Sequence, residues 1–162
     1  MKRCYCLDTN VLIQPWNKHY SMDLCPEYWE IIESLAREGT VFCTHEVRRE
    51  IEKMDDGLKA WIKARPFLIR EVNDSVQVYL RRILARFDRL VDTIKDRSMA
   101  DPWVIAHAWE AGAVVVTKEI ATPPGARKIR IPDVCDQLGL PWMNEFEFLR
   151  AIGVKFSAKL ER

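Results

Sequence analysis

Residues 5–13, YCLDTNVLI, place the polar triplet Asp8-Thr9-Asn10 between two apolar runs. The run Arg3–Leu7 is rich in β-favouring residues, and it predicts a short strand that ends at Asp8. From Thr9 the chain continues into a stretch that contains Pro15, which we expect to be irregular. A strand that ends in a carboxylate is the unit from which we predict both the fold and a site.

Apolar patterns further along the chain predict two more strands and several helices. Thr40–Cys43 and the AVVVT run Ala113–Thr117 are typical of buried strands. Amphipathic spacing predicts helices over Glu27–Glu38, after Thr44 as N-cap, and from Asp101 as N-cap with proline next. Strands that alternate with helices predict an α/β fold, with a central, mainly parallel sheet between two layers of helices.

Residues 1–156 are expected to form one domain, followed by a tail over 157–162. About 59–97 we expect a helical insertion, because apolar residues recur every three or four positions from Val72 to Ile94. Near the C-terminus, Lys128–Ile131 predicts a short strand, and Asp133 predicts the cap of a short helix.

The charge balance excludes some classes of function. The 162 residues carry 25 Lys and Arg against 24 Asp and Glu, a net charge of +1, which argues against a protein that binds nucleic acid through bulk charge. It leaves room for a nuclease, whose active site is acidic. The sequence lacks GxGxxG, GxxxxGK[ST] and GxSxG motifs, so a dinucleotide site, a P-loop and a serine-hydrolase elbow have no support.

The five cysteines are odd in number and have no CxxC spacing, which favours reduced thiols in a cytoplasmic protein. A zinc site is the weaker alternative, since the three histidines are not spaced with the cysteines as ligands. No apolar run approaches 18 residues, and the N-terminus has no signal-peptide pattern.

Acidic residues follow the predicted strands. Asp8 ends the first, Glu46 and Glu50 lie early in the helix after the second, and Glu119 follows the AVVVT strand, while Asp101 starts the helix that leads to it. Because the carboxyl ends of parallel strands share one edge of a sheet, these acids are expected to converge there. Clustered carboxylates favour a hard cation such as Mg²⁺ or Mn²⁺, which supports phosphodiester hydrolysis.

Each acid also has a structural interpretation. Asp8 fits a turn, Asp101 fits an N-cap, Glu119 fits a loop, and Glu46 and Glu50 fit a solvated helix face. Only their joint placement at strand ends indicates a site.

The same residues carry a resemblance to a known family. The run YCLDTNVLI resembles the opening signature of PIN-domain ribonucleases, and Asp101–Ala108 with Val115–Glu119 resembles the second half of that domain. Ile131–Cys135 extends the match over nearly the whole chain except the helical middle. The sequence is most similar to VapC-like toxins of toxin–antitoxin systems, with a longer helical insert.

The resemblance implies a PIN-like fold and Mg²⁺- or Mn²⁺-dependent cleavage of single-stranded RNA. It implies that Asp8 and Asp101 are metal ligands, with Asn10 nearby and Thr117 assisting by hydrogen bonding. Its second acid best matches Glu50, with Glu46 as the competing choice. The fourth acid of the family is usually Asp, whereas this chain has Glu119. A small antitoxin partner and a homodimer are further implications.

Basic residues are the candidates for binding the RNA backbone. The first set lies in a stretch, from Lys59 to Arg70, that contains no acidic residue, which suits contact with phosphate. The second set is interleaved with aspartates, which favours a solvated helix face. The first set is Lys59, Lys63, Arg65 and Arg70, and the second is Arg81, Arg82, Arg86, Arg89, Lys95 and Arg97.

Two other functions stay open. A non-catalytic PIN-like scaffold is supported by glutamate at position 119, and a phosphatase of small phosphate esters is a weaker alternative.

Overall fold

A computed structural model describes residues 3–54, 57–91 and 99–161 of the chain. In these ranges a five-stranded sheet has the order β3-β2-β1-β4-β5, and every neighbouring pair is parallel. β1 lies at its centre, paired with β2 on one side and β4 on the other. The strands are β1 Tyr5–Leu7, β2 Val41–Thr44, β3 Ile69–Arg70, β4 Val114–Val116 and β5 Trp142–Met143.

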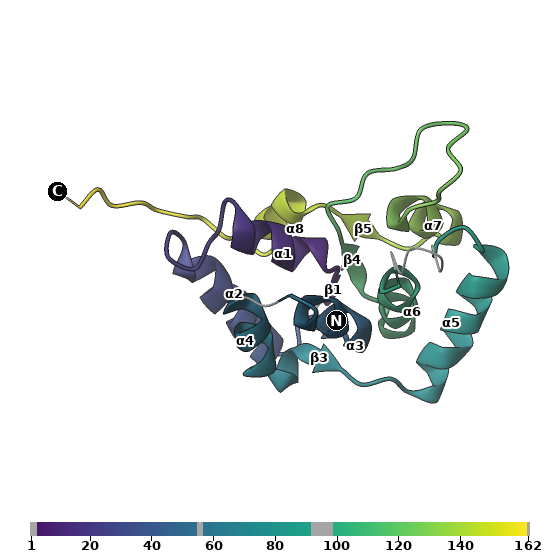
Figure 1. Cartoon of the computed structure of the whole chain (residues 1–162), viewed down its shortest axis with the longest axis horizontal. Helices are drawn as coiled ribbons and strands as arrows, with labels where there is room; N and C mark the ends of the chain where they lie inside the picture. The colour runs from purple at the N-terminus through teal and green to yellow at the C-terminus, as the bar shows by residue number, and fades with distance from the viewer. Residues whose placement is uncertain (1–2, 55–56, 92–98, 162) are drawn as a thin grey trace.

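Helices cover both faces of this sheet (Figure 1). α6 packs on β1, β2 and β4 and separates them from α5 and α7, while α2 packs on β2. In Figure 1, α5, α6 and α7 lie on one side and α1, α2 and α4 on the other. The helices are α1 Asn10–Asn17, α2 Pro26–Arg37, α3 His45–Glu52, α4 Gly57–Lys63, the 3-10 helix η1 Pro66–Leu68, α5 Asp74–Arg86, α6 Asp101–Ala111, α7 Ile131–Leu138 and α8 Glu145–Ala151.

The central strands are buried throughout, which explains their composition. All residues of β1, β2 and β4 are buried, as expected for strands covered by helices on both faces. Valine fits β4 because its branched side chain packs well on a pleated surface. The prediction of an α/β fold with a parallel sheet between helices is confirmed.

Within the described ranges, no helix has the length and apolar character needed to cross a membrane.

The stretch after Asp8 is helical, so the irregular conformation expected from Pro15 is wrong. Pro15 lies inside α1 and has no N–H to donate to Val11 O, its partner one turn earlier. The Tyr28 hydroxyl of α2 donates to that carbonyl instead, at 3.0 Å. A tertiary hydrogen bond therefore compensates for the proline.

The predicted helical insertion about 59–97 requires a correction. It contains the strand β3, whose two residues are too few to show an alternating pattern. The helix expected over Val72–Ile94 is shorter, because Asn73 caps α5 by accepting from Val76 N and the helix ends at Arg86. Residues 92–98, including Lys95 and Arg97, lie outside the described residues.

The strand predicted over Lys128–Ile131 is also wrong. Ile131 is the first residue of α7, and Asp133 lies in its first turn, where it accepts a hydrogen bond from Arg130 N at 2.8 Å. The proline at position 132 fits the first turn, where its missing N–H has no helical partner.

The cysteines are free thiols. Cys6, Cys43 and Cys135 are buried, and burial raises the pKa of each thiol, that of Cys135 to about 12. These three side chains therefore act as small core residues with little thiolate at neutral pH.

Replacing Ile105 by alanine tests the packing of α6 on the sheet. Ile105 is fully buried, so Ile105→Ala is expected to lower the free energy of unfolding by about 2–5 kcal/mol. The control Leu84→Ala alters a leucine on α5 that is 42% exposed and should change stability by about 0.5 kcal/mol or less. Chemical denaturation followed by circular dichroism measures both, and equal effects would contradict this packing.

Candidate active site

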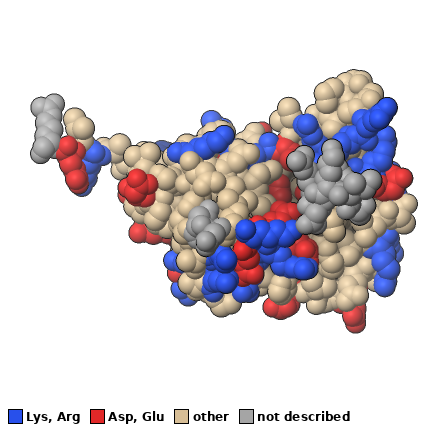
Figure 2. Space-filling view, in the orientation of Figure 1, with Lys and Arg blue, Asp and Glu red and all other residues tan. Residues whose placement is uncertain are grey.

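Four acidic residues line one open cavity at the carboxyl edge of the sheet. Its volume is about 270 Å³, and Figure 2 shows acidic side chains gathered near the centre of this face of the molecule. Glu46 is not part of the lining, and its carboxylate accepts from Arg49 on the same helix at 3.0 Å. The lining residues are Asp8, Thr9, Asn10, Ile13, Gln14, Glu50, Asp101 and Glu119.

Asp8 is held by both of its carboxylate oxygens. The residue directly follows β1, and its own N–H donates to Val116 O of β4. Thr9 N donates to Oδ1 at 2.7 Å, and the Thr117 hydroxyl donates to Oδ2 at 2.8 Å. The parallel pairing of β1 and β4 thus brings Thr117 beside Asp8, 109 positions away in the sequence.

Glu50 reaches the cavity from α3. Its Oε2 accepts from the Thr9 hydroxyl at 2.5 Å, and Ala100 N donates to its Oε1 at 3.4 Å. Thr9 thereby joins the two acids, through its N–H to Asp8 and its hydroxyl to Glu50. Sequence reasoning missed this role of Thr9, although its place between Asp8 and Asn10 was a usable signal.

Asp101 does not act as the helix cap that its position suggested. Ala100 is the N-cap of α6, and Asp101 is the first residue of the helix. The Asp101 side chain is 6% exposed, and its buried Oδ2 has no hydrogen-bond partner in the described part of the chain. A buried carboxylate oxygen without a hydrogen-bond partner needs a compensating group such as a cation or a proton. A role as helix cap, the structural explanation for Asp101, does not supply such a group.

Glu119 has a structural task as well as a place in the cavity. Its Oε2 accepts from Ile131 N at 2.9 Å, so its carboxylate satisfies a free N–H at the start of α7. Thr117 and Lys118 fix the segment before it, since Glu119 N donates to Thr117 Oγ1 and Lys118 N donates to Asn10 Oδ1. Asn10 thus orients the segment that carries Glu119.

A second ionic cluster supports the same segment from α8. Glu145 is 1% exposed, and its Oε1 accepts from Lys118 Nζ at 2.8 Å and lies 3.0 Å from His19 Nε2. The Lys118 side chain is therefore anchored on α8, while its backbone contacts Asn10. Nothing in the local sequence pattern predicted this cluster, because its members come from three distant segments.

Burial and mutual repulsion dominate the electrostatics of the cavity. Desolvation raises the pKa of Asp8 to about 7, with the charges of Glu119 and Glu50 adding to the rise. Desolvation likewise raises the pKa of Asp101 to about 9, with contributions from Asp8, Glu119 and Glu50. Such shifts mark a site that favours added positive charge or bound protons.

The donor chemistry of the cavity fits a hard divalent cation, because its charged groups are all carboxylates. In the part of the chain that the structure describes, however, no group of three or more His, Cys, Asp or Glu side chains is arranged so that it could hold a metal ion. Glu50 and Glu119 are instead bonded to protein donors.

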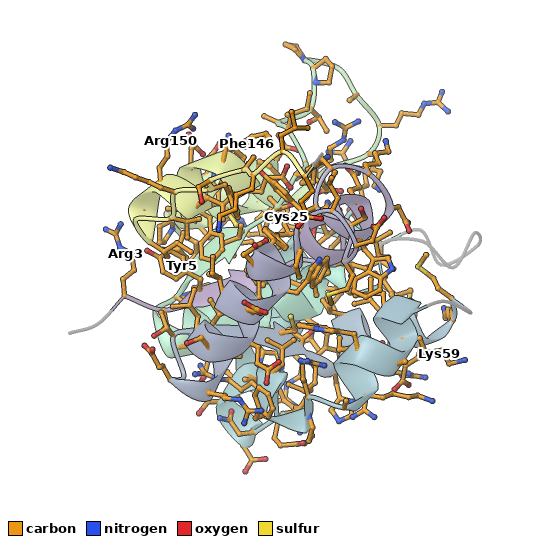
Figure 3. All side chains as sticks on the ribbon, turned by 90° about the vertical axis from the view of Figure 1, so that its left-hand side faces the viewer. Arg3, Tyr5, Cys25, Lys59, Phe146 and Arg150 are labelled. Carbon is orange, nitrogen blue, oxygen red and sulfur yellow. The ribbon has the colours of Figure 1, made fainter. Side chains whose placement is uncertain are left out.

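The basic residues predicted to bind RNA are mostly engaged elsewhere. Arg65 pairs with Glu33 at 2.7 Å and lies over the ring of Trp61, and Arg70 lies over the ring of Phe42. Lys59 and Lys63 are on α4, and Figure 3 shows Lys59 across the molecule from Arg150 of α8. The structure does not place these four residues in the lining of the acidic cavity.

The raised pKa values predict how stability depends on pH. Between about pH 5 and pH 9 in EDTA, the folded state binds more protons at Asp8 and Asp101 than the unfolded state, so the free energy of unfolding should fall as pH rises. Asp101→Asn removes one titrating group and should raise Tm at pH 8 by about 2–4 °C or more. Thermal melts across this range measure both effects, and a stability that rises with pH would contradict desolvation and repulsion as the cause of the shifts.

Solved structures share this fold at low sequence identity. VapBC-1 from nontypeable Haemophilus influenzae matches with a TM-score of 0.51 at 16% identity, covering 87% of this chain and 97% of that one. VapBC2 from Rickettsia felis, solved with a DNA fragment from its promoter, matches with a TM-score of 0.51 at 18% identity, covering 87% and 98%. The predicted PIN-like fold is thus confirmed.

The comparison with curated proteins finds no match. A family model described as a domain of unknown function, DUF4411, matches residues 5–156. The match spans every strand and helix of the structure, from β1 to α8. The chain therefore belongs to the DUF4411 family.

Proposed function

We propose that this protein is a metal-dependent endoribonuclease that hydrolyses phosphodiester bonds of single-stranded RNA. The observation that carries the proposal is the convergence of Asp8, Glu50, Asp101 and Glu119 on one cavity, with Asp101 Oδ2 buried and unpartnered within the described residues. The PIN-like fold supports it, because the structural neighbours are VapBC complexes and VapC is a PIN-domain ribonuclease.

Asp8, Glu50, Asp101 and Glu119 would hold Mg²⁺ or Mn²⁺. When bound, such an ion polarises a phosphoryl oxygen and lowers the pKa of a bound water molecule. Thr9 and Thr117 orient the Asp8 carboxylate by hydrogen bonds, and Thr9 also fixes Glu50. These contacts support the acids before any ligand binds, which reduces the reorganisation that the reaction requires.

We further propose that the protein is the toxin of a type II toxin–antitoxin pair in the cytoplasm, controlled by a small antitoxin and forming a homodimer. The support is the nature of the neighbours, which are toxin–antitoxin complexes.

Neutral isosteres of the acids test the proposed reaction. With a 5′-labelled single-stranded RNA and Mg²⁺ or Mn²⁺, Asp8→Asn and Asp101→Asn should each lower kcat/KM by about 100-fold or more, because each removes a ligand charge. Glu50→Gln should have a similar effect, whereas the matched variant Glu46→Gln should cut like the wild type. Equal cleavage by all variants, or cleavage that persists in EDTA, would refute the proposal.

Metal binding can be measured without any substrate. At a Mn²⁺ concentration near 100 times Kd, the wild type should gain about 2.7 kcal/mol in its free energy of unfolding. Asp8→Asn and Asp101→Asn should lose most of that gain, and Glu46→Gln should keep it. Calorimetric or thermal-shift titration provides the measurement.

A non-catalytic PIN-like scaffold is the second candidate, favoured by the bond from Ile131 N that engages Glu119 and by the lack of a preformed ligand group among the described acids. It predicts no response to Mn²⁺ in the titration above, and no RNA cleavage by the wild type.

A further inference from the structure

Two adjoining hollows lie between the end of α5, the helix α7 and the loop after β4. Their volumes are about 170 and 290 Å³, and they share Arg89, Ile129 and Gln137 as lining residues. α5 and α7 both pack against α6, which explains why their ends leave a groove between them. We call the two hollows together the α5–α7 groove.

Basic side chains outnumber acidic ones in the lining of this groove. Arg86, Arg89 and Lys128 line it with exposed side chains, and the loop 120–130 holds three basic residues and no acidic one. Figure 2 shows Lys and Arg side chains gathered at the upper right, where Figure 1 draws this loop and α7. Two acids, Asp88 and Asp133, also contribute to the lining.

Asp133 is committed to holding the loop. Its Oδ1 accepts from Thr122 N at 2.9 Å, and its Oδ2 accepts from the Thr122 hydroxyl at 3.0 Å and from Arg130 N at 2.8 Å. Arg130 also donates to Ile120 O, which joins the two ends of the loop. These hydrogen bonds fix the base of the loop, and the basic residues of the loop project from this fixed base.

Among the described residues, the groove and the acidic cavity have no lining residue in common, but two interactions link their surroundings. Glu119 lines the cavity, and its carboxylate binds the N–H of Ile131, the first residue of α7. The positive charge of Lys128 also acts on Asp101. A chain of negative charge that lies along the groove would therefore arrive at the cluster of carboxylates.

We propose that the α5–α7 groove binds the phosphate backbone of single-stranded RNA and leads it to the acidic cavity, an inference that rests on the function proposed above. Arginine and lysine along a groove suit a polyanion. Phe87, the aromatic residue among the lining side chains, is 5% exposed, so it offers no stacking surface for a base. The contacts are made to phosphate and are independent of sequence.

The test uses Arg89→Ala/Lys128→Ala, a double variant in the groove. The matched control is Arg150→Ala/Lys155→Ala, which removes the same charge from exposed residues on α8 and beyond it. A third variant, Lys59→Ala/Lys63→Ala, represents the surface that the sequence suggested. Fluorescence anisotropy with a labelled 15-nucleotide RNA, in an Asp101→Asn background that keeps the RNA intact, gives Kd at several salt concentrations.

The groove variant should bind about tenfold more weakly, and its slope of log Kd against log salt should fall by about 1.4, since each lost phosphate contact accounts for about 0.7. In the cleaving protein, KM should rise while kcat is retained. The control should match its parent in both assays. Equal binding by the groove variant and the control, or a loss confined to Lys59→Ala/Lys63→Ala, would overturn the inference.

The two proposals fail in different ways. RNA that binds through the groove but is never cut overturns the ribonuclease proposal alone. RNA that is cut with the same KM by the groove variant and the control overturns the groove alone. The absence of both binding and cleavage overturns both.

Discussion

Repulsion among buried carboxylates at the carboxyl edge of the sheet is the constraint on which the rest of the structure depends. Asp8 and Asp101 are 4% and 6% exposed, and burial together with the neighbouring acids raises the pKa of both. The chain offsets this cost with Thr9 and Thr117, whose hydrogen bonds stabilise Asp8 in its charged form. Both threonines are buried, so the polar frame of the site is continuous with the core.

Much of the fold could be predicted from the sequence, and the reasons are local. The AVVVT run and YCL are short apolar strands, and their polar ends fix which edge carries the acids. β3 could not be predicted because two residues carry no periodicity, and α1 could not because Tyr28, far along the chain, replaces the hydrogen bond that Pro15 removes. In both places a contact with another segment decides the local structure: β3 pairs with β2, and Tyr28 of α2 bonds to α1.

The candidate site, like the fold, could be predicted from the sequence only in part. The sequence pointed to Asp8, Glu119, Asp101 and one of two glutamates, Glu46 or Glu50, and the cavity contains Asp8, Glu119, Asp101 and Glu50. It left Glu46 and Glu50 open, because residues four positions apart lie on the same face of a helix. In the structure Glu50 accepts from Thr9 and Glu46 accepts from Arg49, and these contacts separate the two. The bond between Glu119 and Ile131 N, and the cluster of Glu145 with Lys118, depend on tertiary contacts that no spacing encodes.

The hydroxyl of Tyr28 has a wider consequence than repair of a helix. Its hydrogen bond joins α2 to α1, and the α1 residues Asn10 and Gln14 line the cavity. Burial raises the pKa of Tyr28 well above that of a free phenol, so the group stays a donor at neutral and mildly alkaline pH. This hydrogen bond therefore couples the position of α1, and with it the shape of the acidic cavity, to α2. Substitutions around Tyr28 are expected to change the cavity although Tyr28 does not line it.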